Sequence, residues 1–245
     1  MSFRFHFVAR LGFFFLLFGC STSPVLPLLN HEEIVNRDRA LGDEIAQNFK
    51  LQFKFKSDFE VLRYLKNLGQ ELVNSTQQLA EFPVGVWIFL RNQEKWFSYG
   101  LPGNRIYLPL DLLKSLDFEN EIAAAMAIQF GHLLRRDLAE QISREEFIPN
   151  ANIDVNNIFS FPEVANLKAT ILAVGILYRS GYDARGLISL FKRFEKDPDH
   201  SPYEKGILEK MIQQARREIS MNTPMRNPIV RSQNFLLIQK RMHSL

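Results

Sequence analysis

The sequence contains a single cysteine, Cys20, among its 245 residues. One cysteine excludes an internal disulfide and any metal site built from several thiolates. The net charge is only +3, and two of the positive residues, Arg4 and Arg10, lie close to the start of the chain. Because the remainder is nearly neutral, charge gives little support for a nucleic-acid partner, and we expect none.

The apolar run over residues 11–18 follows these two arginines and is too short to span a bilayer. It ends at Leu17-Phe18-Gly19-Cys20, which resembles the lipobox of bacterial lipoproteins. That resemblance implies that Cys20 becomes an acylated N-terminus and anchors the chain to a membrane. Ser21 then favours the outer membrane, with the protein facing the periplasm. An ordinary secretory signal or a short membrane anchor is the alternative.

The composition indicates one folded domain. Hydrophobic residues make up 46% of the chain, which is ample for a packed core. We find no internal repeat and no low-complexity tract. We therefore expect a signal peptide over residues 1–20, a proline-containing tether over residues 21–32, and one domain over residues 33–245.

Hydrophobic periodicity predicts a mainly α domain of the α+β class with a small sheet. A capping box of Ser57 and Glu60 is expected to begin the second helix. The stretch 137–162 is expected to be a loop or a short helical piece. Helices are predicted over 31–49, 59–74, 110–116, 119–135, 163–180, 184–194, 203–219 and 229–242, and strands over 84–90 and 105–108.

The helix predicted over residues 119–135 is rich in alanine and nearly uncharged, so we expect it in the core. A helix of this kind carries zinc in peptidases with the motif His-Glu-x-x-His, in which two histidines at i and i+4 bind the metal and the glutamate takes a proton from bound water. Here only the last histidine is present, as His132. Ile128 and Gln129 occupy the other two positions. A packed, hydrogen-bonded core histidine is the simpler interpretation of His132.

The order of motifs resembles the HtpX-like and CAAX-prenyl-protease-like zinc metallopeptidases, metallopeptidase family forty-eight, over roughly residues 33–240. The residues that carry the resemblance are Leu101-Pro102-Gly103-Asn104 before a strand, the acidic start of the helix at Glu119, the pair Gly131-His132, and Gly181-Tyr182-Asp183. The resemblance implies a zincin-like fold. It also implies that an extended peptide pairs with an edge strand, expected to be Arg105, Ile106, Tyr107 and Leu108.

The departures from the family pattern predict that zinc and catalysis are lost. The third zinc ligand of the family is a glutamate, and its position falls on Lys168 in one alignment and on Val164 in another. A catalytic zinc needs three protein ligands, so we expect no cofactor and no catalytic residue. We further expect that either Lys168 or a water molecule bonds to Gln129 and His132 in the empty site.

Three functions follow from this pattern. The first is a pseudopeptidase, a membrane-anchored peptide-binding, chaperone-like or scaffold factor of the cell envelope. The second is a zinc metalloendopeptidase in which His132 acts with displaced ligands such as His200, Glu163 or Glu121. The third is a structural lipoprotein whose groove is closed.

Overall fold

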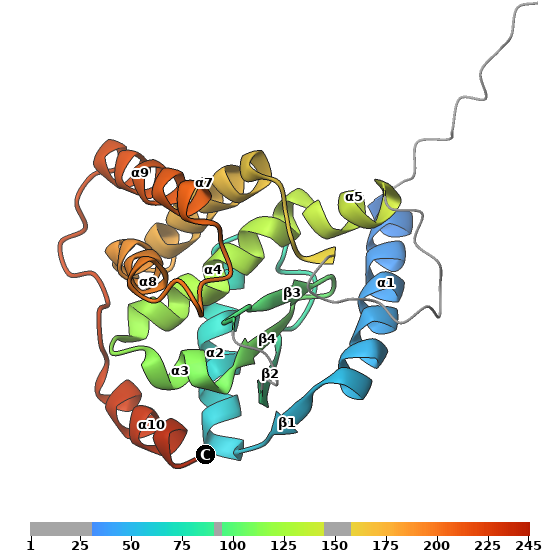
Figure 1. The fold of residues 1–245 in the computed structure, drawn as a ribbon, viewed down its shortest axis with the longest axis horizontal. Helices are drawn as coiled ribbons and strands as arrows, with labels where there is room; N and C mark the ends of the chain where they lie inside the picture. Colours follow the sequence, from blue (N-terminus) through green and yellow to red (C-terminus); the bar gives the residue numbers. More distant parts are fainter. Residues whose placement is uncertain (1–30, 91–94, 145–157) are drawn as a thin grey trace, which may run out of the picture.

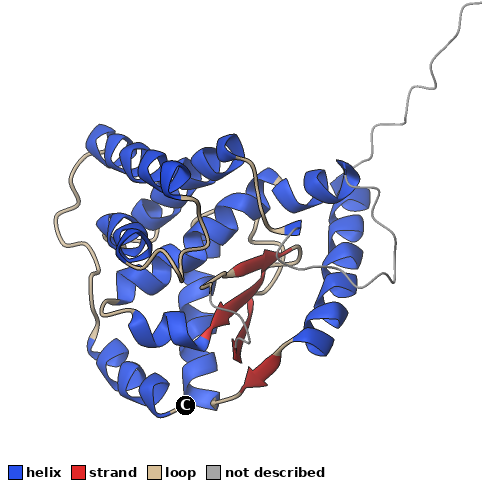
Figure 2. Cartoon of the chain, in the orientation of Figure 1, coloured by secondary structure: helices blue, strands red, loops and turns tan. Residues whose placement is uncertain are grey.

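The computed structural model describes residues 31–90, 95–144 and 158–245. Helices dominate it and surround one small sheet (Figures 1 and 2). The predicted signal peptide and most of the tether, including Cys20, lie outside the described residues. No helix within the described ranges is both long and apolar enough to cross a membrane.

The helices agree closely with the sequence prediction, and α5 is a short helix within the stretch 137–162, where a loop or a short helical piece was expected. The chain begins with α1 (His31–Gln52) and α2 (Phe59–Asn74), and the central helix is α4 (Glu119–Arg135). The other helices are α3 (Leu110–Ser115), α5 (Asp137–Arg144), α7 (Glu163–Arg179), α8 (Arg185–Lys196), α9 (Lys205–Met221) and α10 (Gln233–Ser244).

Within the described residues, the sheet has four strands in the order β1-β2-β4-β3. The two predicted strands are present as β2 (Gly85–Leu90) and β4 (Arg105–Pro109), and they pair in parallel. Two strands of three residues each were not predicted, β1 (Lys54–Lys56) and β3 (Tyr99–Leu101). Both pair antiparallel with their neighbours.

The position of β4 corrects the prediction of an edge strand at Arg105, Ile106, Tyr107 and Leu108. This strand lies inside the sheet, between β2 and β3. The turn at Pro102-Gly103-Asn104 returns the chain antiparallel, so the residues before the turn form β3 and cover the side of β4 that was expected to be free. The edge beside α4 is therefore β3.

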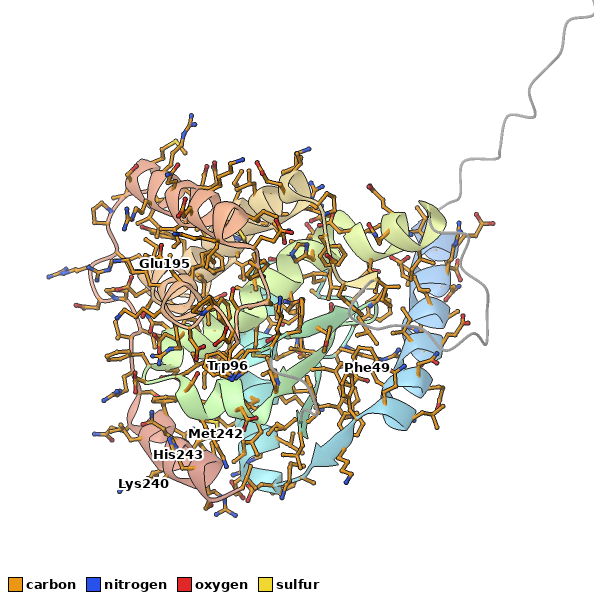
Figure 3. All side chains as sticks on the ribbon, in the orientation of Figure 1. Phe49, Trp96, Glu195, Lys240, Met242 and His243 are labelled. Carbon is orange, nitrogen blue, oxygen red and sulfur yellow. The ribbon has the colours of Figure 1, made fainter. Side chains whose placement is uncertain are left out.

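Successive side chains along each strand point to opposite sides of the sheet, and both sides are apolar. Phe89, Tyr99 and Tyr107 face α1, where Phe49 meets Tyr107 at a ring distance of 4.7 Å and Tyr99 at 5.2 Å. Phe49 is labelled between α1 and the sheet in Figure 3. On the other face, Ile88, Ile106 and Leu108 pack among residues of α2 and α4. The sheet thus lies between α1 and the helical core.

Close backbone approach fixes how α4 crosses α7. A Cβ added to Gly131 of α4 would lie 2.6 Å from the carbonyl oxygen of Ala169 in α7, so only glycine allows this crossing. The residues of α7 that face α4, among them Ala165, Ala169 and Ala173, are small and buried. The crossing determines which side chains of α7 reach the middle of α4.

The start of α2 differs from the predicted capping box. Asp58, not Ser57, is the N-cap: its Oδ1 accepts the backbone N–H groups of Glu60 and Val61, each at 3.0 Å. The Asp58 carboxylate also accepts a hydrogen bond from Arg241 of α10 at 3.1 Å, and this bond is the main reason that the pKa of Asp58 is lowered.

We predict that Asp58→Ala lowers the free energy of unfolding by about 1 kcal/mol, because the capping bonds at the start of α2 are lost. Ser57→Ala is the matched control and should change it by less than about 0.5 kcal/mol. Urea denaturation followed by circular dichroism measures both. An equal effect of the two substitutions would contradict the assignment of the cap.

We predict that Gly131→Ala lowers the free energy of unfolding by about 1–3 kcal/mol, because a methyl group forces α4 and α7 apart. Gly206→Ala is the control: Gly206 lies in α9, where an added Cβ meets nothing within 4 Å. That substitution should stabilise the protein by up to about 1 kcal/mol. Thermal and urea unfolding measure both, and a neutral Gly131→Ala would refute the close crossing.

Candidate functional site

The middle of α4 contains the positions that correspond to the zinc-binding motif His-Glu-x-x-His. Ile128, Gln129 and His132 are all buried, with side chains 3%, 6% and 4% exposed. Positions 128 and 132 are one helical turn apart, so they share a face of α4. Ile128 belongs to the apolar core, and of these three residues only His132 is a metal-ligating type.

His132 is held by a carboxylate that the sequence analysis missed. Its Nδ1 lies 2.8 Å from Oδ2 of Asp137, which is itself buried. Arg136 ends α4 in the left-handed conformation, with φ of 57°, and this turn returns Asp137 toward the helix. Arg135 donates its Nε–H to Asp137 at 3.2 Å. The signal for this contact was an aspartate two residues after the predicted helix end.

The ring of His132 is also covered by an aromatic residue from the segment before α7. Phe161 stacks on it with ring centroids 4.4 Å apart and an angle of 29°. In the same segment, Phe159 contacts Tyr99 of β3 edge-on at 4.9 Å. The segment that contains these two phenylalanines therefore packs over both the histidine and the edge strand.

A small polar cavity of about 70 Å³ lies beside His132. Its polar lining includes Gln129, Asn166, Ser98 and Ser160. Asn166 donates its side-chain N–H to the carbonyl of Phe161 at 2.8 Å, whereas the Gln129 side chain has no hydrogen-bond partner among the described residues. The volume admits a few water molecules or one small polar group.

The structure contradicts the prediction that Lys168 bonds to Gln129 and His132. Lys168 is exposed, and so is Val164, the ligand position in the other alignment, at 60%. Helical geometry explains this result, because the buried face of α7 includes Ala165, Asn166 and Ala169, so that positions 164 and 168 point outward. Asn166, not Lys168, is the residue of α7 that lines the cavity beside Gln129 and His132.

The displaced ligands considered for a working enzyme have partners of their own. Glu163 pairs with Lys210 of α9 at 2.7 Å. His200 bonds to Asp197 at 2.8 Å and stacks on Trp96, which is labelled in Figure 3. Within the described residues, no group of three His, Cys, Asp or Glu side chains could hold a metal ion.

Glu121, the third displaced ligand, belongs to the start of α4. It is fully buried, and its Oε2 accepts the backbone N–H groups of Asp117 and Phe118 at 2.9 and 3.1 Å. Its Oε1 accepts a hydrogen bond from Ser189. These contacts give Glu121 a capping role about three helical turns away from His132.

The side chains at this site can bind a polar ligand. Burial lowers the pKa of His132, and the hydrogen bond that His132 donates to Asp137 opposes that shift. A neutral His132 donates from Nδ1 to Asp137 and keeps Nε2 as an acceptor. Gln129 has the shape of glutamate, yet its amide cannot accept the proton of an attacking water. The group can hold a polar ligand, and it lacks a general base at the position that the family uses.

The strand next to this cavity is β3. A Cβ on Gly100 would lie 3.0 Å from Cβ and 3.4 Å from Oε1 of Gln129, so the strand backbone runs directly against α4. Ser98 and Phe97, immediately before the strand, line the cavity. Gln129 and His132, the two residues named from the sequence, line this cavity together, whereas the strand beside it is β3 and not the predicted β4.

We predict that the protein loses stability as the pH falls below 6.5, the ordinary pKa of histidine, because folded His132 resists protonation. The contribution of neutral His132 to the free energy of unfolding is complete above pH 6.5 and decreases as the pH falls toward the lowered pKa of His132. Urea unfolding at pH 7 and pH 5 measures it. The decrease should be smaller in His132→Gln, and identical decreases in both proteins would contradict a buried neutral His132.

Comparison with known proteins gives a distant match. No protein-family model matches the chain. The beta-barrel assembly-enhancing protease of Yersinia pestis is 19% identical over 244 aligned positions, which cover 85% of this chain and 49% of the relative. The chain thus spans about half the length of that relative. The similarity supports at most a metallopeptidase-like family for this chain.

Proposed function

We propose that this chain is a pseudopeptidase, a peptidase-like protein that binds extended polypeptide without cleaving it. The observation that carries the proposal is the pattern at α4. His132 keeps its carboxylate partner, whereas Ile128 and Gln129 stand where a second ligand and the general base are needed. A catalytic zinc needs three protein ligands, and a single imidazole supplies one of them.

The proposed peptide-binding element is β3. Among the strands in the described part of the chain, the outer ones are β1 and β3. The β1 strand carries Lys54 and Lys56, and lysines of this kind protect an edge against pairing. The β3 strand carries no charge and adjoins the cavity at Ser98. All three residues of β3 are buried, with Gly100 against Gln129 of α4 and Phe159 packed on Tyr99. Binding therefore requires the segment around Phe159 to move and the backbone edge of β3 to become accessible beside α4.

The proposed location is the cell envelope, with a lipid anchor at Cys20, which lies outside the described residues. The lipobox-like sequence supports the anchor, and the name of the Yersinia pestis relative refers to β-barrel assembly. We propose outer-membrane attachment facing the periplasm, where the protein acts on extended segments of other proteins as a chaperone-like or scaffold factor. No nucleic-acid partner is proposed.

One observation favours the alternative, a working zinc endopeptidase. Histidines that bind metals usually donate their second ring nitrogen to a carboxylate, and Asp137 has this relation to His132. That enzyme would need two further ligands to approach His132, together with a base other than Gln129. The partners of Glu163, His200 and Glu121 make the alternative the weaker candidate.

The test is an NMR titration of the full chain with an octapeptide of alternating valine and threonine, which favours strands. We predict shifted amide signals at residues 98–101 and at Gln129, with little change at β1, which serves as the internal control. The octapeptide should remain intact after prolonged incubation. Cleavage that is lost in His132→Ala would contradict the pseudopeptidase, and shifts confined to β1 or absent altogether would contradict the role of β3.

A further inference from the structure

A second and larger cavity lies away from the site at His132 and shares no lining residue with it. Its volume is about 590 Å³, within the range of small-ligand sites. One wall is α2, another is the start of α4 with Tyr182 after α7, and the third is the connection between α9 and α10. Polar groups on the walls include Tyr64, Tyr182, Glu71 and Glu119.

The connection between α9 and α10 is attached firmly to its neighbours. Ile229 exchanges backbone hydrogen bonds with Gly181 and Asp183 at 2.8 and 2.9 Å. Ser232 donates its backbone N–H to Oε2 of Glu119 at 2.6 Å. These bonds hold the third wall in place, so the cavity is a feature of the folded chain.

Two tyrosines point their hydroxyl groups at two carboxylates in this cavity. Tyr64 is 7% exposed and donates to Glu119 at 2.7 Å, and Tyr182 is 2% exposed and donates to Glu71 at 3.1 Å. Burial is the main reason that the pKa of both tyrosines is raised, and the negative charges of Glu71 and Glu119 act on both in the same direction. The four groups therefore form one electronegative cluster.

Neither carboxylate has a cationic partner among the described residues. Glu119 is only 4% exposed, and buried carboxylates are normally paired with a cation. Arg231 also lines the cavity, but its guanidinium lies 4.7 Å over the ring of Phe118 and donates to the carbonyl of Asp117. Glu119 accepts two hydrogen bonds, so two of its roughly four lone-pair positions remain available.

The cavity continues along α2. A further hollow of about 380 Å³ shares Tyr64, Asn67 and Asn234 with it and reaches Glu60 and Arg63. Together they form a groove between α2 and the C-terminal part of the chain. A groove of this length suits a chain-like ligand that places one charged group among Glu71, Glu119 and the two tyrosines.

We propose that this groove binds an organic cation, with a guanidinium or ammonium group received by Glu71 and Glu119 and packed against Tyr64 and Tyr182. The carboxylates supply charge-assisted hydrogen bonds, and the tyrosine rings attract the cation through their faces. The source is either an arginine or lysine side chain of a partner polypeptide or a free amine. This site is independent of the peptide-binding strand β3.

Isothermal titration calorimetry of the full chain with L-argininamide tests the proposal. The neutral isostere L-citrullinamide should bind at least about tenfold more weakly. Glu71→Gln should weaken argininamide binding by about tenfold or more, and because Glu71 is exposed the variant should fold normally. Glu195→Gln is the matched control, an exposed glutamate of α8 labelled in Figure 3, and should bind as the unchanged protein does.

Absence of saturable argininamide binding, equal binding of the two amides, or no effect of Glu71→Gln would overturn the proposal. A decapeptide with one central arginine among neutral residues identifies the source. Tighter binding of the decapeptide than of argininamide assigns the groove to a polypeptide partner, and equal or weaker binding assigns it to a free amine. Because the two sites share no residue, these results do not depend on peptide binding at β3.

Discussion

The crossing of α4 over α7 at Gly131 is the constraint on which the rest of the structure depends. An α-helix that is buried along nearly its whole length must be contacted on every side, and α7 approaches so closely that a methyl group does not fit between the two backbones. This contact fixes the rotation of α7. It brings Asn166 to the cavity beside His132 and directs Lys168 into solvent.

The same crossing shows how α4 is held in the core by packing alone. The packing surfaces of α4 are made by alanines, Met126, Ile128 and Phe130, and none of them depends on a metal. His132 is satisfied by Asp137 and covered by Phe161, so the imidazole has a structural role without zinc. Ile128 contributes apolar contact in the core, which favours folding.

The sequence was sufficient for the long helices and for the two strands with clear β-propensity, since periodicity over many residues reports the buried face directly. It failed where the outcome depends on a few residues and on tertiary contacts. The three residues of β3 carry too little pattern to be recognised, and without them β4 was mistaken for an edge. The alternation in Phe53-Lys54-Phe55-Lys56 was a usable signal for β1.

The site residues also divide into those indicated by local sequence pattern and those that depend on tertiary contacts. Gln129 and His132 were found because their spacing on a helix matches a known motif. Asp137 was missed because its approach to His132 depends on the left-handed conformation of Arg136, which no local pattern specified. The placement of Lys168 was wrong because it relied on an alignment of sequence positions, whereas the rotation of α7 is set by its contact with Gly131.

The most direct test of the account is the zinc content of the purified full chain, measured by elemental analysis after incubation with equimolar zinc and gel filtration, with His132→Ala as the matched variant. The account predicts that the zinc retained is far below one ion per chain and is the same in both proteins. One zinc ion per chain that is lost in His132→Ala would contradict it.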